Sequence, residues 1–345
     1  MTNHAQFLAE KRFGSLDGLR AISVVAVVWH HTAPNWVKGA WAHFGAQGVT
    51  LFFAISGFLI TTLLLRERER TGGIDIKAFY LRRTLRIFPL YYGVLLLYIA
   101  LVILLERNTP AGRAFFDNLI YFATYTSNIF VDLDGRVIFY FAWSLAAEEQ
   151  FYLIWPSILL IAGTVSRASI VLYLTFAACV VGQWLGNRFF SAVPLAIVLG
   201  ALLALTLHTS QGYRSIQTML GQKWSLPFLS LALVLALAVP SSPAFVIHAL
   251  FAGIVGACVI RRDHLGAAFL SLKPIAYVGS ISYGIYMLHM LCKNAAVKLF
   301  SALNVSSPGG FEVFAATLVL AVIAASLSFK YYESIFLKMK HRHER

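Results

Sequence analysis

Apolar runs of about 20 residues recur along the whole chain, and they limit the possible folds more than any other feature. Such a run crosses a bilayer as one α-helix, because a helix satisfies its own backbone polar groups. With 59% hydrophobic residues, 12% charged residues and a mean hydropathy of +0.73, the chain cannot be a water-soluble globule. We expect an all-α polytopic membrane protein with ten full-length spans. They are expected at residues 18–33, 46–65, 85–105, 142–163, 168–185, 191–208, 226–240, 243–260, 274–297 and 311–330.

Basic residues decide the expected orientation of these spans. An eleventh apolar stretch, residues 115–130, is shorter than the others and is interrupted by polar side chains. If this stretch does not cross the membrane, most of the 28 Lys and Arg lie on the cytoplasmic side, whereas a crossing largely removes the bias. We therefore expect 115–130 to form a re-entrant or interfacial helix on the outer side, held against protein and not lipid.

This orientation predicts a multi-pass protein of the cell inner (plasma) membrane with both termini in the cytoplasm. We expect one integral membrane domain over residues 1–345, with a basic cytoplasmic loop at 66–86 and a cytoplasmic tail at 331–345. The net charge of +13 lies mainly beside membrane helices, which indicates contact with anionic membrane lipids and no nucleic acid partner. The three cysteines are odd in number and lie in apolar stretches, so we expect neither a disulfide nor a metal site.

The first span, Leu16 to Thr32, carries ionisable residues at both ends. Arg20 and His31 share one helix face at about 100° per residue, with roughly 16 Å of rise between them. Asp17 falls on the same face, whereas His30 points about 80° away from it. Two interpretations stay open. Arg20 can be a surface anchor and His31 an interfacial histidine, or both can serve a ligand that lies along the helix.

Three arginines, Arg82, Arg83 and Arg86, open the third span on one side of a helix. Such a group can hold phosphate through bidentate hydrogen bonds. Head-group anchoring is the alternative. Three arginines in five positions exceed what anchoring needs, so we favour an anion site.

Two adjacent carboxylates, Glu148 and Glu149, lie in the first half of the fourth span. Because they are adjacent, they cannot both face the same partner. In a dry site one of them could orient or deprotonate a histidine on another helix, whereas a purely structural pair would need two buried partners. His289, in the ninth span, is adequately explained as a packed core histidine.

Four motifs in order resemble the membrane-bound acyltransferase-3 family, whose members O-acylate glycans, lipids and antibiotics. Arg20 and His31 fit the family's pattern of an arginine and a histidine separated by ten residues, and Phe52 to Ile60 resembles its second-helix motif. The ninth span departs from the family, which often has a histidine followed by a proline where this chain has His289 and Met290. The resemblance covers nearly the whole chain.

The other two motifs lie in the third and fourth spans. Phe79 to Tyr92 resembles the arginine motif of the family, with Arg83 and Arg86 in its R-x-x-R positions. Trp143 to Pro156 resembles the glutamate motif, with Glu148 in the acidic place. The resemblance implies acetyl-CoA or another acyl-CoA as the donor and a hydroxyl of a carbohydrate-type acceptor, such as a cell-surface or lipid-linked glycan.

The resemblance also implies roles for single residues. His31 would act as general base on the acceptor hydroxyl, or as a transient acyl carrier, with Glu148 orienting it. Arg20 would hold the pantetheine arm or the developing charge, and the three arginines of the third span would hold the nucleotide phosphates, which would place the thioester near His31. The residues expected at the substrate are Trp143, Ser144, Glu149 and Tyr152.

A second function class explains part of the pattern. In a proton-coupled transporter or exporter of an anionic solute, the arginines would form a gate and His31 with Glu148 a proton relay. This alternative accounts for the intramembrane charges but not for four ordered motifs. A polytopic partner protein without chemistry would leave the two adjacent glutamates unexplained. The acyl group, the acceptor and a possible homo-oligomer stay open.

Overall fold

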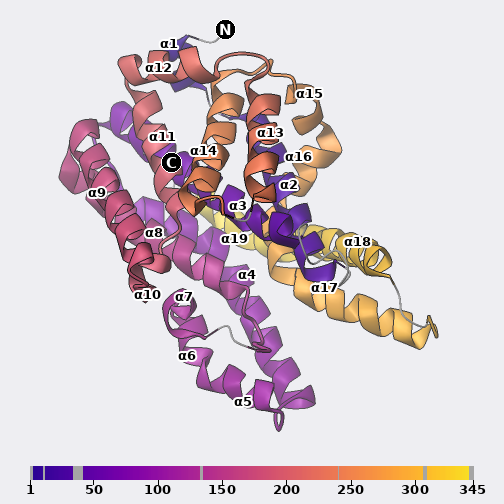
Figure 1. Cartoon of the computed structure of the whole chain (residues 1–345). Helices are drawn as coiled ribbons and strands as arrows, with labels where there is room; N and C mark the ends of the chain where they lie inside the picture. The colour runs from indigo at the N-terminus through magenta and orange to yellow at the C-terminus, as the bar shows by residue number, and fades with distance from the viewer. Residues whose placement is uncertain are drawn as a thin grey trace. The chain divides into compact units, whose positions relative to one another are not determined.

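The computed structural model describes residues 3–10, 12–33, 42–132, 135–239, 241–305 and 309–341, and every regular element in these ranges is a helix (Figure 1). Lys11 and residues 342–345, which belong to the expected cytoplasmic side, lie outside the described residues, as does the last position of the expected span 226–240. The chain forms two compact units. Unit 1 holds Met1–Arg70 and Leu195–Lys330, and unit 2 holds Thr71–Pro194 and Tyr331–Arg345.

The chain is a membrane protein, but the expected ten spans are not confirmed. Among the described residues, five helices are long and apolar enough to cross a membrane, or up to seven if each of two bent helix pairs is one span. The five are Gly45–Thr71, Ile76–Leu105, Ala142–Ala162, Val165–Trp184 and Gly310–Met339. Two expected spans, α13 (Ser225–Ala238) and α14 (Ala244–Ile260), have only 14 and 17 residues, short of the roughly 20 that a bilayer requires.

The helix α2 (Gly14–Thr32) is largely buried and lies at the core of unit 1. It packs against α16 (Lys273–Ser280), α17 (Ser282–Ala302) and α18 (Gly310–Ser328). The contact with α16 is a backbone contact, since a Cβ at Gly279 would come within 1.8 Å of the Asp17 carbonyl oxygen. Only glycine allows the two helices to approach this closely.

A second close helix contact in unit 1 joins α3 (Ala42–Thr71) to α11 (Leu195–His208). A Cβ at Gly57 would lie 2.0 Å from the Ile197 carbonyl oxygen, and one at Gly200 would lie 2.2 Å from that of Ala54. The small residues therefore face each other from both helices. Almost all of α11 is buried, and α14 packs on it while α13 runs beside α14 (Figure 1).

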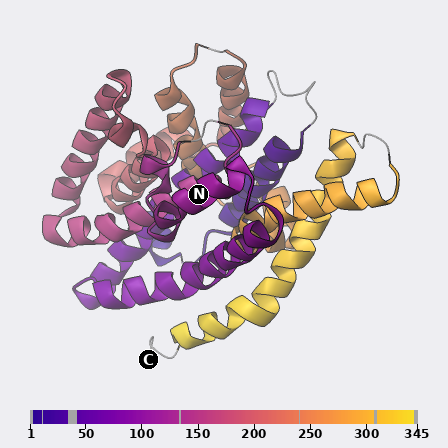
Figure 2. The same cartoon turned by 90° about the horizontal axis from the view of Figure 1, so that it is seen from below.

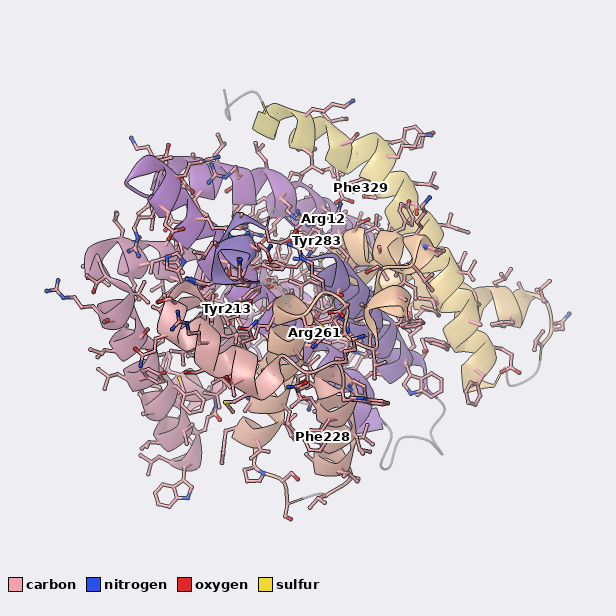
Figure 3. The ribbon with its side chains drawn as sticks, turned by 90° about the horizontal axis from the view of Figure 1, so that it is seen from above. Arg12, Tyr213, Phe228, Arg261, Tyr283 and Phe329 are labelled. Carbon is pink, nitrogen blue, oxygen red and sulfur yellow. The ribbon has the colours of Figure 1, made fainter. Side chains whose placement is uncertain are left out.

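The N-terminal helix α1 (His4–Ala9) is held to unit 1 by Arg66 of α3 and by α12 (Ser210–Leu220). Arg66 donates to the Phe7 carbonyl oxygen at 2.9 Å and also to that of Glu10, so one guanidinium satisfies carbonyls at the end of α1. The Phe7 ring lies 5.4 Å from the ring of Tyr213, which Figure 3 labels. Aromatic packing and carbonyl capping thus fix a helix that is too short to be stable alone.

Unit 2 contains α4 (Ile76–Leu105), α8 (Ala142–Ala162), α9 (Val165–Trp184) and several short helices. The expectation of a loop over 66–86 is wrong for most of its length, because α3 continues to Thr71 and α4 begins at Ile76. Gly72 has φ +78°, a conformation that commonly ends a helix, and the Asp75 side chain accepts from the Ala78 N–H at 2.9 Å to start the next one.

The expectation of one helix over 115–130 is also wrong. This stretch consists of the end of α5 (Pro110–Asp117), followed by α6 (Leu119–Ala123) and α7 (Ser127–Phe130). The chain breaks where Tyr125 has φ +53°. The carbonyls at this break are satisfied by side chains, which is why it can persist away from water. The donors are the hydroxyls of Tyr91 and Tyr92, to Phe122 at 2.7 Å and Ala123 at 2.8 Å, and the Gln150 amide, to Tyr125 at 2.8 Å.

The segment expected as a tail is helical over its described part. From α18 the chain continues through a π-helical turn, Phe329–Glu333, into α19 (Ser334–His341), the yellow end of the ribbon in Figure 2. Within unit 2, the Tyr332 hydroxyl donates to the Pro89 carbonyl oxygen of α4 at 3.0 Å. The last helix is therefore packed on α4 and is not a free tail.

Candidate active site

In unit 1, α2 carries both residues of the expected arginine and histidine pair. Arg20 lies in its second turn, where Nη1 is 3.4 Å from Oδ1 of Asp17. The other oxygen of this buried carboxylate accepts from Nη2 of Arg12 at 2.7 Å. Asp17 thus interacts with two guanidinium groups, those of Arg12 and Arg20.

His31 lies in the last turn of α2 and contacts a second histidine, His289 of α17. Nδ1 of His31 is 2.8 Å from Nε2 of His289, and the ring centroids are 4.8 Å apart. Nδ1 of His289 is 2.5 Å from the Tyr286 carbonyl oxygen, one turn back on α17. His289 itself is completely buried.

The sequence reasoning missed His289 as a partner of His31. Two signals were available: a histidine inside an apolar span is costly unless it has a polar partner, and the resembled family often has a histidine at this place. Its partner could not be named, because the two histidines are 258 positions apart in the sequence. The helix contact between α2 and α17 brings them together.

In unit 2, the arginine and glutamate motifs meet between α4 and α8. The guanidinium carbon of Arg83 lies 4.7 Å from the ring centroid of Tyr152, in cation–π geometry. The Tyr152 hydroxyl donates to Oε1 of Glu148, one turn back on α8. Glu149 interacts electrostatically with Arg83 and with Tyr92 of α4. Glu148 thus contacts Tyr152 of its own helix, and Glu149 interacts with Arg83 of α4.

The other residues expected in the site lie on the same two helices. Arg82 is half-buried and Arg86 is exposed on α4. Ser144 is buried and donates to the Phe141 carbonyl oxygen at 3.3 Å, so its hydroxyl is used within the first turn of α8. Trp143 is half-buried beside it.

The structure groups these residues by unit. Arg20 and His31 lie in unit 1, and the arginine and glutamate motifs lie in unit 2. The expected orientation of His31 by Glu148 stays a prediction, and within each unit the imidazole pairs with His289 and the carboxylate with Tyr152. In the part of the chain that the structure describes, no three His, Cys, Asp or Glu side chains are arranged to hold a metal.

Long apolar helices, a pair of histidines of which His289 is buried, and an arginine motif in contact with a glutamate motif define a helical membrane protein with ionisable groups within its helices. The acyltransferase-3 family, described as an acyltransferase domain, matches residues 13–329. The chain therefore belongs to this family.

The chain is similar to several bacterial O-acetyltransferases. It is 26% identical to the peptidoglycan O-acetyltransferase OatA of Listeria monocytogenes over 94% of this chain and 56% of that protein. It is 28% identical to YrhL of Bacillus subtilis, a candidate peptidoglycan O-acetyltransferase, over 79% and 47%, and 27% identical to a candidate O-acetyltransferase of Staphylococcus aureus over 94% and 57%. The chain spans about half the length of these relatives. No solved structure matches.

Proposed function

We propose that this protein is a membrane O-acyltransferase that moves an acyl group from cytoplasmic acyl-CoA to a hydroxyl of a carbohydrate-type acceptor. Acetyl is the proposed acyl group, and a cell-surface or lipid-linked glycan is the proposed acceptor. The observation that carries the proposal is the family match over 13–329, which contains His31 and both charged motifs. The names of the relatives, O-acetyltransferases and in two cases peptidoglycan O-acetyltransferases, support the same class of reaction.

In this reaction His31 acts as general base. The acceptor hydroxyl gives its proton to a ring nitrogen of His31 while its oxygen attacks the carbonyl carbon of the thioester. The carbon–sulfur bond then breaks, and the CoA thiolate takes the proton from the imidazolium. The products are the ester and CoA thiol. The alternative, in which His31 carries the acyl group between the two substrates, has the same overall balance.

The arginines of α4 are the proposed ligands of the nucleotide phosphates. Arg86 is the exposed member of the group, and Arg83 also contacts the Tyr152 ring. Arg20 is the proposed partner of the pantetheine arm or of the developing negative charge, and its contact with Asp17 fixes its direction. The proposal therefore assigns donor binding to Arg82, Arg83 and Arg86 and chemistry to His31.

Calorimetric binding of acetyl-CoA, CoA and acetate to purified protein tests this division. Arg86→Ala should weaken acetyl-CoA binding about 10-fold or more, since a charge-assisted hydrogen bond contributes about 1.5–3 kcal/mol. Lys77→Ala is the matched control, because Lys77 is also exposed on α4 but projects about 180° away from Arg86. His31→Ala should leave acetyl-CoA binding within about twofold and abolish acetyl transfer to muropeptides.

Two results would contradict the proposal. If a folded sample binds none of the CoA species, the acyltransferase assignment of this chain fails. If vesicles containing the protein take up an anionic solute without any acyl donor, the transporter alternative replaces it. Equal loss of binding in His31→Ala, Arg83→Ala and Arg86→Ala would overturn the separate roles of these residues.

A further inference from the structure

The histidine pair of unit 1 has a fixed direction of hydrogen bonding. A backbone carbonyl can only accept a hydrogen bond, so Nδ1 of His289, 2.5 Å from the Tyr286 oxygen, carries a hydrogen. In a neutral imidazole the other nitrogen is then an acceptor. Nε2 of His289 therefore accepts from Nδ1–H of His31, across 2.8 Å.

This direction decides the tautomer of His31. With the hydrogen on Nδ1, the lone pair of the neutral His31 ring lies on Nε2. A general base needs this lone pair, because it is the atom that takes the proton. The Tyr286 carbonyl thus sets the protonation of a ring on another helix, through His289.

We infer that His289 is a positioning residue for His31, which holds the His31 ring in the tautomer that presents Nε2 as the base. The hydrogen-bond geometry carries this inference, and its consequence for transfer rests on the proposed function of His31. His289 acts through His31, because its Nε2 lies against Nδ1 of His31 and its Nδ1 lies against the Tyr286 carbonyl oxygen.

The pair also stabilises the charged intermediate state. When Nε2 of His31 takes the hydroxyl proton, the positive charge spreads over the ring, and Nδ1–H continues to donate to Nε2 of His289 as a charge-assisted bond. The proton then leaves from the same Nε2 to the CoA thiolate. Neither step moves the hydrogen between the two rings, so His289 stays neutral throughout and its bond to Tyr286 is kept.

Burial makes His289 suitable for this role. Its side chain is completely buried, and a buried polar group holds its geometry because loss of a hydrogen bond costs about 1–3 kcal/mol. Two other groups act on the pair. His30 lies next to His31, with 5.0 Å between ring centroids, and Lys293, one turn further along α17, interacts electrostatically with both rings.

The tautomer can be measured without any assay of activity. Protein labelled with ¹⁵N-histidine, in lipid bilayers, is examined by solid-state NMR, and His31 is assigned by its loss in His31→Gln. We expect a protonated Nδ1 and an unprotonated Nε2 for His31. His289→Leu should abolish this preference, whereas His289→Gln should keep it, because the amide oxygen can accept from Nδ1–H. A proton on Nε2 of His31 in the unaltered protein would overturn the inference, as would an unchanged spectrum in His289→Leu.

A kinetic measurement separates positioning from folding. His289→Leu should lower kcat about 10- to 100-fold with acetyl-CoA as donor and leave its KM within about twofold, and His289→Gln should restore most of the rate. Met287→Leu, at another fully buried position of α17, is the control and should keep kcat. Loss of activity in His289→Gln equal to that in His289→Leu would overturn the positioning role. Absence of transfer in the unaltered protein would contradict the proposed function alone, because the NMR spectrum decides the tautomer independently.

Discussion

His264, in the connection between α14 and α15 (Ala267–Leu270), has a tautomer fixed by its two neighbours. Its Nδ1 accepts from the Gly266 N–H at 3.2 Å, so the hydrogen lies on Nε2, which donates to the Ser15 hydroxyl at 3.0 Å. A charged ring carries hydrogens on both nitrogens, so it would lose the hydrogen bond from the Gly266 N–H. Burial lowers the pKa of His264, and the nearby Asp263 carboxylate opposes this shift only in part.

The sign of the resulting pH dependence follows from linkage. The unfolded pKa of histidine is about 6.5 and the folded pKa of His264 is lower, so the folded state binds fewer protons. We expect this stabilisation to be complete above about pH 6.5 and to fall as the pH drops below it. Thermal unfolding at pH 7.5 and pH 5.5 measures the effect. In His264→Asn, which still accepts from the Gly266 N–H but does not titrate, Tm should change less between the two pH values.

Ser15→Ala is the matched control for this prediction. It removes one hydrogen bond, at a cost of about 1 kcal/mol at either pH, and keeps the titrating ring, so the difference between the two pH values should remain. If the difference in Tm between the two pH values is the same in His264→Asn as in the unaltered protein, the pH dependence belongs to other groups.

Asp263, the carboxylate beside His264, is itself held by Arg261, which Figure 3 labels. The two hydrogen bonds between them measure 3.0 and 3.2 Å.

Among elements, the broken stretch α6–α7 depends on side chains of its neighbours. The Gln150 amide donates to the Tyr125 carbonyl oxygen at 2.8 Å and to Oδ1 of Asn128 at 2.9 Å, while its oxygen accepts from the Asn128 amide. One glutamine thus bridges the residue at the break and the helix that follows it.

We therefore expect Gln150→Leu to destabilise unit 2 by about 1–3 kcal/mol, the cost of leaving buried polar groups without partners. Gln150→Glu should show a similar loss, because a carboxylate keeps the shape but cannot donate to the Tyr125 carbonyl. Unfolding in SDS measures the difference. Gln183→Leu, on α9 of the same unit, is the control and should change stability by less than about 0.5 kcal/mol. Unchanged stability in Gln150→Leu would show that the break is held by the two tyrosines alone.

Hydropathy and motif spacing predicted the presence of the helices better than the residues at which the helices begin and end. The helical class and the placement of Arg20 and His31 on one helix followed from local periodicity. The break at Tyr125 could not be predicted from local periodicity, because it depends on hydrogen-bond donors from α4 and α8. The pairing of His31 with His289 could not be predicted either, since the sequences of apolar helices do not indicate which helices pack together.

At the level of the whole molecule, the number of crossings depends on the excursion between α4 and α8. Arg136 forms an ion pair of 2.6 Å with Glu106, directly after α4, so the chain returns to the end of the helix that it left. In between, Ala123 accepts from Tyr92, which lies about 21 Å back along α4 at 1.5 Å per residue. The structure shows that the excursion ends near where it began, whereas its re-entrant path through a membrane and the orientation expected from the basic residues stay predictions.

Accessibility of single cysteines to a membrane-impermeant maleimide tests this topology in the full-length chain after replacement of Cys179, Cys258 and Cys292. Asn108→Cys and Asp132→Cys, at exposed positions before and after the stretch 115–130, should both react in intact cells. Gly73→Cys, where the added side chain meets no neighbour within 4 Å, should react only after permeabilisation. If Asn108→Cys reacts from outside and Asp132→Cys only from inside, the excursion crosses the membrane. Every later loop would then change sides, and the basic residues after α8 would lie outside the cell, against the positive-inside rule.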